Sequence, residues 1–111
     1  MDYDNKEIFI KANKALAEGN YEEFIEYCAD DIKWINVGGS IFNGKTEILK
    51  YISSSYNGIS FTTEDHITEK DLVIEFGQIV FENIDNEKES SYCDIWKFKD
   101  GLIIQVKSFV I

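Results

Sequence analysis

The stretch YCDIWKFKDGLIIQVKSFV, residues 92–110, carries the clearest structural signal in this sequence. Its first half alternates, so that one face of the predicted strand carries Tyr92, Asp94, Trp96 and Phe98. Asp100-Gly101 follows, and this dipeptide suits the positive φ angles of a tight two-residue turn. The stretch therefore predicts a β-hairpin with strands over about residues 90–99 and 102–110.

Three further strands are indicated upstream of this hairpin. Residues 59–68 and 72–81 alternate or run apolar and are separated by a turn-like Glu-Lys-Asp segment. Residues 31–37, DIKWINV, place Ile32, Trp34 and Asn36 on one face. The sequence therefore predicts one isolated strand and, after it, four consecutive strands.

Helical periodicity precedes and interrupts these strands. A first helix, capped by Asp4 or Asn5, ends at Gly19, and its apolar face carries Ile8, Ala12, Ala15 and Leu16. A second helix begins after Asn20, which forms a capping-box pattern with Glu23. Residues 43–56 predict a third helix.

The predicted order of elements is ααβαββββ. Helices on one side of an antiparallel sheet are typical of an α+β fold, and the sheet must wrap the helices to bury its concave face. We therefore expect a single domain over residues 1–111, in which three helices and a strongly curved sheet form a cone around an apolar pocket.

The charge balance argues against several classes of partner. The sequence has 21 Asp and Glu against 11 Lys and Arg, a formal net charge of −10. Nucleic acid and anionic membrane surfaces are not expected as partners, because both bind positive protein surfaces. No phosphate-binding glycine motif and no metal-ligand spacing is present, so no cofactor and no metal are expected.

Other features of the sequence favour a cytoplasmic protein. The N-terminus lacks a basic flank followed by an apolar run, and no segment approaches the roughly 18 apolar residues that span a bilayer. Cys28 and Cys93 lie far apart and outside any CxxC pattern. This spacing favours two reduced, mostly buried thiols over a disulfide.

Asp94 most needs an explanation, because the strand face that it shares is otherwise aromatic. An ionised carboxylate buried without partners costs several kcal/mol. A buried Asp94 would find hydrogen bonds, or stay protonated and act as a hydrogen-bond donor or a reactive base. The alternative is a strand turned so that Asp94 faces solvent beside a lysine such as Lys97.

Three other polar residues are weaker candidates. Asn36 either satisfies backbone groups near the following glycine pair or points into the pocket, where its amide can orient a substrate but cannot take its proton. Tyr51 on the third helix can offer a phenol donor, although simple packing is the default interpretation. His66, the only histidine, is expected to be exposed to solvent.

Three segments together resemble the SnoaL-like and ketosteroid-isomerase-like branch of the nuclear transport factor 2 (NTF2-like) superfamily. They are YCADDIKW at residues 27–34, NGKTEILKYI at residues 43–52, and YCDIWKFKDGLIIQVKSFV at residues 92–110. The resemblance covers nearly the whole chain and implies an NTF2-like, cystatin-like cone. It also implies a small dimer with one pocket per subunit, but its motifs specify the fold more than the activity.

The resemblance assigns places in the pocket by position. Asp94 falls where ketosteroid isomerases keep a protonated Asp in the oxyanion hole. The general-base Asp of those isomerases falls on Asn36 and their oxyanion-hole Tyr on Ala12, so two of three catalytic groups are replaced. By the same alignment the pocket would also be lined by Leu16, Cys28, Trp34, Tyr51, Trp96, Val106, Ser108 and Val110.

Two functions are compatible with these residues. In the first, the pocket binds a small, largely apolar ligand that carries an oxygen, with isomerase-, cyclase- or hydrolase-like acid–base chemistry through Asp94. In the second, the chain is a non-catalytic dimerisation or protein-interaction module with a vestigial pocket. Ile79, Phe81 and Phe109 would then serve the interface if they face outward, and a homodimer through the outer sheet face is expected.

Overall fold

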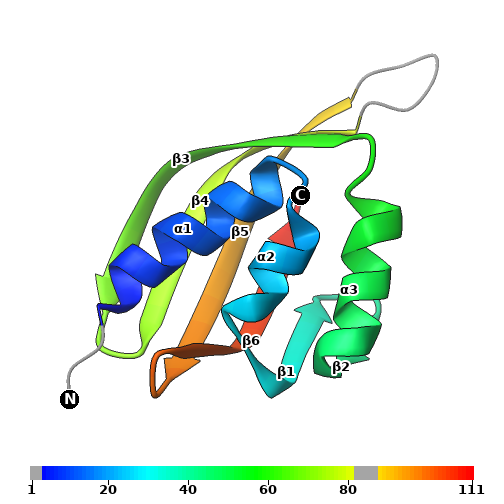
Figure 1. Cartoon of the computed structure of the whole chain (residues 1–111). Helices are drawn as coiled ribbons and strands as arrows, with labels where there is room; N and C mark the ends of the chain where they lie inside the picture. The colour runs from blue at the N-terminus through cyan, green and yellow to red at the C-terminus, as the bar shows by residue number, and fades with distance from the viewer. Residues whose placement is uncertain (1–3, 82–87) are drawn as a thin grey trace.

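The computed structural model describes residues 4–81 and 88–111 (Figure 1). Its elements are α1 (Asn5–Ala17), α2 (Tyr21–Glu26), β1 (Cys28–Asn36), β2 (Ile41–Asn43), α3 (Gly44–Ser55), β3 (Ile59–Glu69), β4 (Leu72–Phe81), β5 (Lys88–Lys99) and β6 (Leu102–Val110). None of the described helices is long and apolar enough to cross a membrane. The helices lie on one face of a curved sheet, which confirms the predicted α+β cone.

Local sequence signals set the ends of α1. The Asp4 carboxylate accepts a hydrogen bond from the Glu7 backbone N–H at 3.1 Å, which identifies Asp4 as the N-cap. Gly19 follows the helix with a φ of 80°, a left-handed conformation that glycine adopts without strain. Asn20 is the N-cap residue of α2, but its side chain makes no capping hydrogen bond, in contrast to the predicted capping box.

The C-terminal hairpin forms as its sequence predicts. Asp100 and Gly101 both have positive φ, at 51° and 78°, as a tight two-residue turn requires. The observed bounds of β6 are those predicted for the second strand of this hairpin, and β4 likewise spans the predicted residues 72–81.

The strands form one mixed sheet in the order β2-β1-β6-β5-β4-β3. All neighbours are antiparallel except β1 and β6, which run parallel and pair Trp34 with Val106. The prediction of an all-antiparallel sheet was wrong at this pair, because alternation reveals a strand but not the direction of its partner. The predicted order also omitted β2, since three residues are too few to show a period.

A bulge bends β3 over the helices. Thr63 pairs with Gly77 and Asp65 with Phe76, which leaves Glu64 as the extra residue of β3. Beyond this bulge the side-chain alternation changes phase. His66 therefore turns inward, half-buried, with its ring 5.2 Å from that of Phe9, whereas the sequence predicted an exposed histidine.

Aromatic side chains fill the space between the helices and the concave face of the sheet. The Phe24 ring of α2 makes edge-on contacts with Trp34 at 6.1 Å and with Trp96 at 5.8 Å, and Phe9 of α1 lies 5.0 Å from Trp96. All four side chains are fully or almost fully buried. Such pairs add about 0.5–1.5 kcal/mol each beyond the area they bury, so this cluster anchors α1 and α2 on the sheet.

Gly77 is predicted to be indispensable to the bend. A β-carbon at this position would lie 2.0 Å from the Thr62 carbonyl oxygen, which is backbone and cannot rotate away. The Gly77→Ala variant should lose at least about 3 kcal/mol of unfolding free energy in urea denaturation. Gly39→Ala is the matched control, because no atom comes closer than 3.7 Å to its new carbon, and equal stability of the two variants would contradict this account.

Candidate functional site

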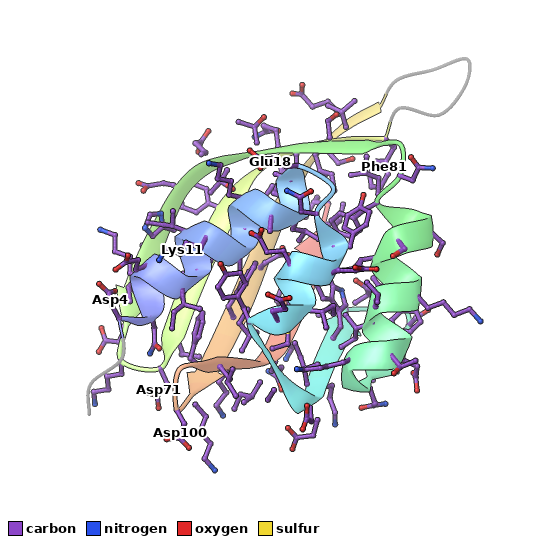
Figure 2. All side chains as sticks on the ribbon, in the orientation of Figure 1. Asp4, Lys11, Glu18, Asp71, Phe81 and Asp100 are labelled. Atoms are coloured by element: carbon purple, nitrogen blue, oxygen red, sulfur yellow. The ribbon has the colours of Figure 1, made fainter. Side chains whose placement is uncertain are left out.

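A cavity of about 250 Å³ lies between the helices and the concave face of the sheet. Figure 2 shows that Phe81, one of its wall residues, lies at the end of the sheet away from the turns at Asp71 and Asp100. The walls are mostly aromatic and aliphatic, with a few polar groups. They are formed by Asn13, Leu16, Asn36, Val37, Tyr51, Tyr56, Ile59, Phe61, Ile79, Phe81, Tyr92, Asp94, Ser108 and Val110.

The residues that the sequence assigned to the pocket separate into two groups. Six of them line the cavity: Leu16, Asn36, Tyr51, Asp94, Ser108 and Val110. The other five lie in the packed core and do not line it: Ala12, Cys28, Trp34, Trp96 and Val106. For Trp34 and Trp96 the physical reason is Phe24, whose ring packs edge-on against both. Ligand contact by any of the eleven stays a prediction.

Asp94 lies in the cavity wall rather than in solvent. It is 7% exposed, and its Oδ1 has no hydrogen-bond partner among the described residues. Burial raises the pKa of Asp94 to about 6, and the Ser108 hydroxyl on the neighbouring strand partly opposes this rise. The side chain is therefore a carboxyl that gains or loses its proton near neutral pH and has one buried oxygen to which no described residue donates a hydrogen bond.

Asn36 connects the core to the cavity. The Trp34 indole N–H donates to the Asn36 side-chain oxygen at 3.0 Å, and the Asn36 amide in turn donates to the Tyr51 hydroxyl oxygen at 3.1 Å. Because that oxygen already accepts a bond, its own hydrogen can point into the cavity. Burial raises the pKa of Tyr51, the Asn36 bond opposes the rise, and the charge of Asp94 adds to it, so the phenol stays a donor at neutral pH.

Tyr56 and Tyr92 also line the cavity. Alternation placed Tyr92 on the same strand face as Asp94, but neither tyrosine was assigned to the pocket from the sequence. Burial, together with the negative charge of Asp94, raises the pKa of Tyr56 well above its ordinary value. The Tyr56 ring makes edge-on contacts with Trp34, Tyr51 and Phe61 at 6.0–6.4 Å. The cavity thus has an aromatic wall whose hydroxyl groups remain protonated.

Glu75 is a second buried acid, which the sequence analysis missed. It is 1% exposed, and its Oε1 accepts hydrogen bonds from the Tyr92 hydroxyl at 2.7 Å and the Thr63 hydroxyl at 3.1 Å. The Asn13 amide of α1 donates to the same Thr63 oxygen at 2.9 Å. Burial and the negative charge of Asp94 raise the pKa of Glu75 to about 7, against the effect of the hydrogen bonds.

Alternation alone could have found Glu75. In β4 it shares the inward face with Val73, Gly77 and Ile79, in the same way that Asp94 shares its face with aromatic residues. Among the residues that the structure describes, no group of three or more His, Cys, Asp or Glu side chains is arranged to hold a metal ion. The polar groups in and next to the cavity include the carboxyls of Asp94 and Glu75, the tyrosine hydroxyls and the amides of Asn13 and Asn36.

The raised pKa values predict that the fold loses stability as the pH rises. The folded protein keeps protons on Glu75 and Asp94 that the unfolded chain releases at its ordinary values of 4.5 and 3.8. Their stabilising effect is complete below about pH 4 and lost as the pH rises through about 7. For Glu75 the change from 4.5 to about 7 corresponds to about 3 kcal/mol.

The measurement is urea denaturation of wild type and Glu75→Gln at several pH values between about 5 and 8. The loss of unfolding free energy over this range should be smaller in Glu75→Gln by up to about 3 kcal/mol. Glu64→Gln is the control, since it removes the same charge from an exposed position of β3. The same pH dependence in Glu75→Gln as in wild type would show that Glu75 is ionised in the folded protein.

Comparison with known proteins agrees with this architecture. Residues 10–106 match the family model of the SnoaL-like domain. No curated protein matches the sequence. An NTF2-like protein of unknown function from Cytophaga hutchinsonii is 20% identical, with a TM-score of 0.79 over 94% of this chain and 96% of that chain.

Two other solved structures are similar. TerC, co-crystallised with polyporic acid, is 16% identical, with a TM-score of 0.81 over 94% of this chain and 88% of that chain. A protein of Shewanella putrefaciens, provisionally assigned as a SnoaL-like polyketide cyclase, is 14% identical, with a TM-score of 0.82 over 96% of this chain and 79% of that chain. At these identities the likeness shows the fold alone. Because the family model covers most of the sequence, the chain belongs to the SnoaL-like domain family, with the NTF2-like fold.

Proposed function

We propose that the cavity binds a small, largely apolar ligand with a carbonyl oxygen, and that Asp94 moves a proton at the carbon beside that carbonyl. One observation carries this proposal. Asp94 is a buried carboxyl without a hydrogen-bond partner for Oδ1 among the described residues, and it lines a cavity whose other walls are mostly aromatic and aliphatic. A carboxyl with a pKa near 6 in such a place is suited to proton transfer at neutral pH.

The cavity groups fit the two halves of such a reaction. Ionised Asp94 takes the proton from the carbon, and the electrons of the broken C–H bond form a C=C bond while the carbonyl π electrons move to oxygen. The Tyr51 hydroxyl, with its hydrogen free, donates to that oxygen as negative charge develops on it. In a ligand that also carries a C=C bond between its β- and γ-carbons, the enolate is a dienolate, and return of the proton from Asp94 to the γ-carbon moves the double bond into conjugation with the carbonyl and completes an isomerisation.

Size and charge limit the ligand. A cavity of about 250 Å³ is smaller than the roughly 300–1,000 Å³ of drug-sized sites, so it fits a molecule of one or two rings. None of the described residues that line it is Lys, Arg or His. An anionic ligand would meet the Asp94 carboxylate without a compensating cation, which favours a neutral ligand.

The protein is proposed to act in the cytoplasm. Cys28 and Cys93 are both free thiols, which supports a reducing compartment. No role for nucleic acid or membrane is proposed, because a net charge of −10 opposes binding to either.

Proton transfer can be tested with 2-tetralone, a neutral two-ring ketone, in D₂O. Wild-type protein should accelerate exchange of the protons beside the carbonyl, followed by ¹H NMR, and the rate should rise with pH through about 6 as Asp94 ionises. Asp94→Asn should lower the protein-catalysed rate by about 10²- to 10⁴-fold. Asp31→Asn is the control, because it removes one charge from an exposed position of β1.

Two results would contradict the proposal in different ways. Exchange at the wild-type rate in Asp94→Asn would remove Asp94 from the reaction. Exchange no faster with wild-type protein than in buffer would contradict proton transfer in this cavity.

A second candidate function, dimerisation through the outer face of the sheet, is favoured by the apolar residues on that face. Ile74 of β4 pairs with Ile95 of β5, and the pair is only half-buried. Phe109 of β6 is also half-buried on this face. Ile79 and Phe81, which the sequence offered for the same interface, instead line the cavity, because the alternation of β4 directs Ile79 inward.

If the outer face of the sheet forms the homodimer interface, a charge introduced at its centre should separate the two subunits. Wild-type protein should sediment as a dimer at micromolar concentration, and Ile95→Glu should sediment as a monomer because it places a carboxylate in an apolar interface. Thr46→Glu is the control, since it adds the same charge on the exposed side of α3. A wild-type monomer in sedimentation velocity would exclude this candidate.

A further inference from the structure

The two buried acids are cross-strand neighbours. The register of β4 and β5 pairs Glu75 directly with Asp94, and the β5–β6 register pairs Asp94 with Ser108. Directly paired residues on one face have β-carbons about 4.5–5.5 Å apart. Both carboxyls lie on the concave face and are more than nine-tenths buried, so water screens their interaction little.

The hydrogen bonds of the pair are unevenly distributed. Glu75 Oε1 accepts from two hydroxyl groups, whereas Glu75 Oε2 and Asp94 Oδ1 are buried and have no partner among the described residues. Two ionised carboxylates would leave both of these oxygens without a donor. If the pair keeps one proton, the protonated carboxyl has an O–H group that can donate a hydrogen bond, and an oxygen of the other carboxylate can accept it.

We propose that Glu75 and Asp94 form one acid pair, which holds a single proton between its two carboxyl groups near neutral pH, and that Glu75 thereby sets the charge of Asp94. The pairing is independent of any ligand, whereas its effect on catalysis rests on the proposed function. Glu75 does not line the cavity, so it is a positioning residue that acts through Asp94.

The groups around Glu75 are consistent with this assignment. His66 on β3 is paired with Glu75 in register, and Asp94 and Tyr92 face it from β5. The Trp96 indole nitrogen is buried without a hydrogen-bond partner in the described part of the chain, yet it lies near enough to lower the pKa of Glu75. Burial and the charge of Asp94 outweigh the three nearby donors, and the net effect is a raised pKa.

The pair has a defined consequence for the proposed reaction. With one proton on the pair, Asp94 can accept the ligand proton and the pair becomes neutral, with one proton on each carboxyl. Return of that proton to the ligand carbon restores the single negative charge. Loss of the last proton from Glu75 would add a second negative charge beside Asp94 and make Asp94 a stronger base.

The experiment is a ¹³C NMR titration of the side-chain carboxyl groups in ligand-free wild type, Asp94→Asn and Glu75→Gln. In wild type, Asp94 should ionise first and its signal should respond a second time when Glu75 ionises, as coupled groups do. In Asp94→Asn the midpoint of Glu75 should shift to lower pH, because the neighbouring charge has been removed. In Glu75→Gln the Asp94 signal should show one step only.

Glu64→Gln and Asp31→Asn are the charge-matched controls, and neither should shift the Glu75 midpoint, because both positions are exposed. An unchanged Glu75 midpoint in Asp94→Asn, or a Glu75 that ionises before Asp94, would overturn the acid pair. If Asp94→Asn does not fold, the Glu75→Gln titration decides alone, and two steps in its Asp94 signal would overturn the pair.

The activity measurement separates this inference from the proposed function. The rate of 2-tetralone exchange should rise with pH in two steps in wild type and in one step in Glu75→Gln, a difference that a purely structural role of Glu75 would not produce. Coupled titration without any exchange activity would leave the acid pair standing and refute the proposed function. Exchange activity with independent titration of the two carboxyls would support the proposed function and refute the acid pair.

Discussion

The close approach of the β3 backbone to Gly77 is the constraint on which the site depends. Because Gly77 has no side chain, the backbone of β3 can approach it closely, bulge at Glu64 and bend over the helices. The bend brings Thr63 within hydrogen-bond distance of both Asn13 on α1 and Glu75 on β4. One glycine therefore decides whether the polar groups beneath the cavity can be satisfied at all.

The packing of the aromatic side chains separates the filled core from the cavity. In the core, Phe24 packs against both Trp34 and Trp96, and none of the three lines the cavity. Next to this core, Tyr51, Tyr56 and Phe61 meet mainly edge to face and enclose the space that Asp94 enters. The carboxyl is held in apolar surroundings by a packed aromatic layer, and this surrounding raises its pKa.

Most helices and strands could be predicted from the sequence, but how distant strands pair and where they bend could not. The hairpin at Asp100-Gly101 and the stop at Gly19 follow from local backbone preferences, which tertiary packing did not override. The parallel pairing of β1 with β6 and the bulge at Glu64 depend on contacts between distant segments, and a local pattern carries no record of these. The core position of Trp34 depends in the same way on Phe24, since both can line or fill a pocket until the packing is known.

The acids illustrate the same limit. Asp94 was identified because three aromatic residues share its strand face, whereas Glu75 shares its face with aliphatic residues and a glycine and was overlooked among many surface acids. The resemblance to ketosteroid isomerases gives Asp94 the role of a protonated donor and leaves Asn36 in place of the base. In the proposed reaction these roles are exchanged. Asn36 orients the Tyr51 hydroxyl, which becomes the donor, and this leaves Asp94 free to act as the base. A base in those apolar surroundings needs a nearby group that limits the negative charge, and Glu75 is the neighbour in register that can keep a proton there.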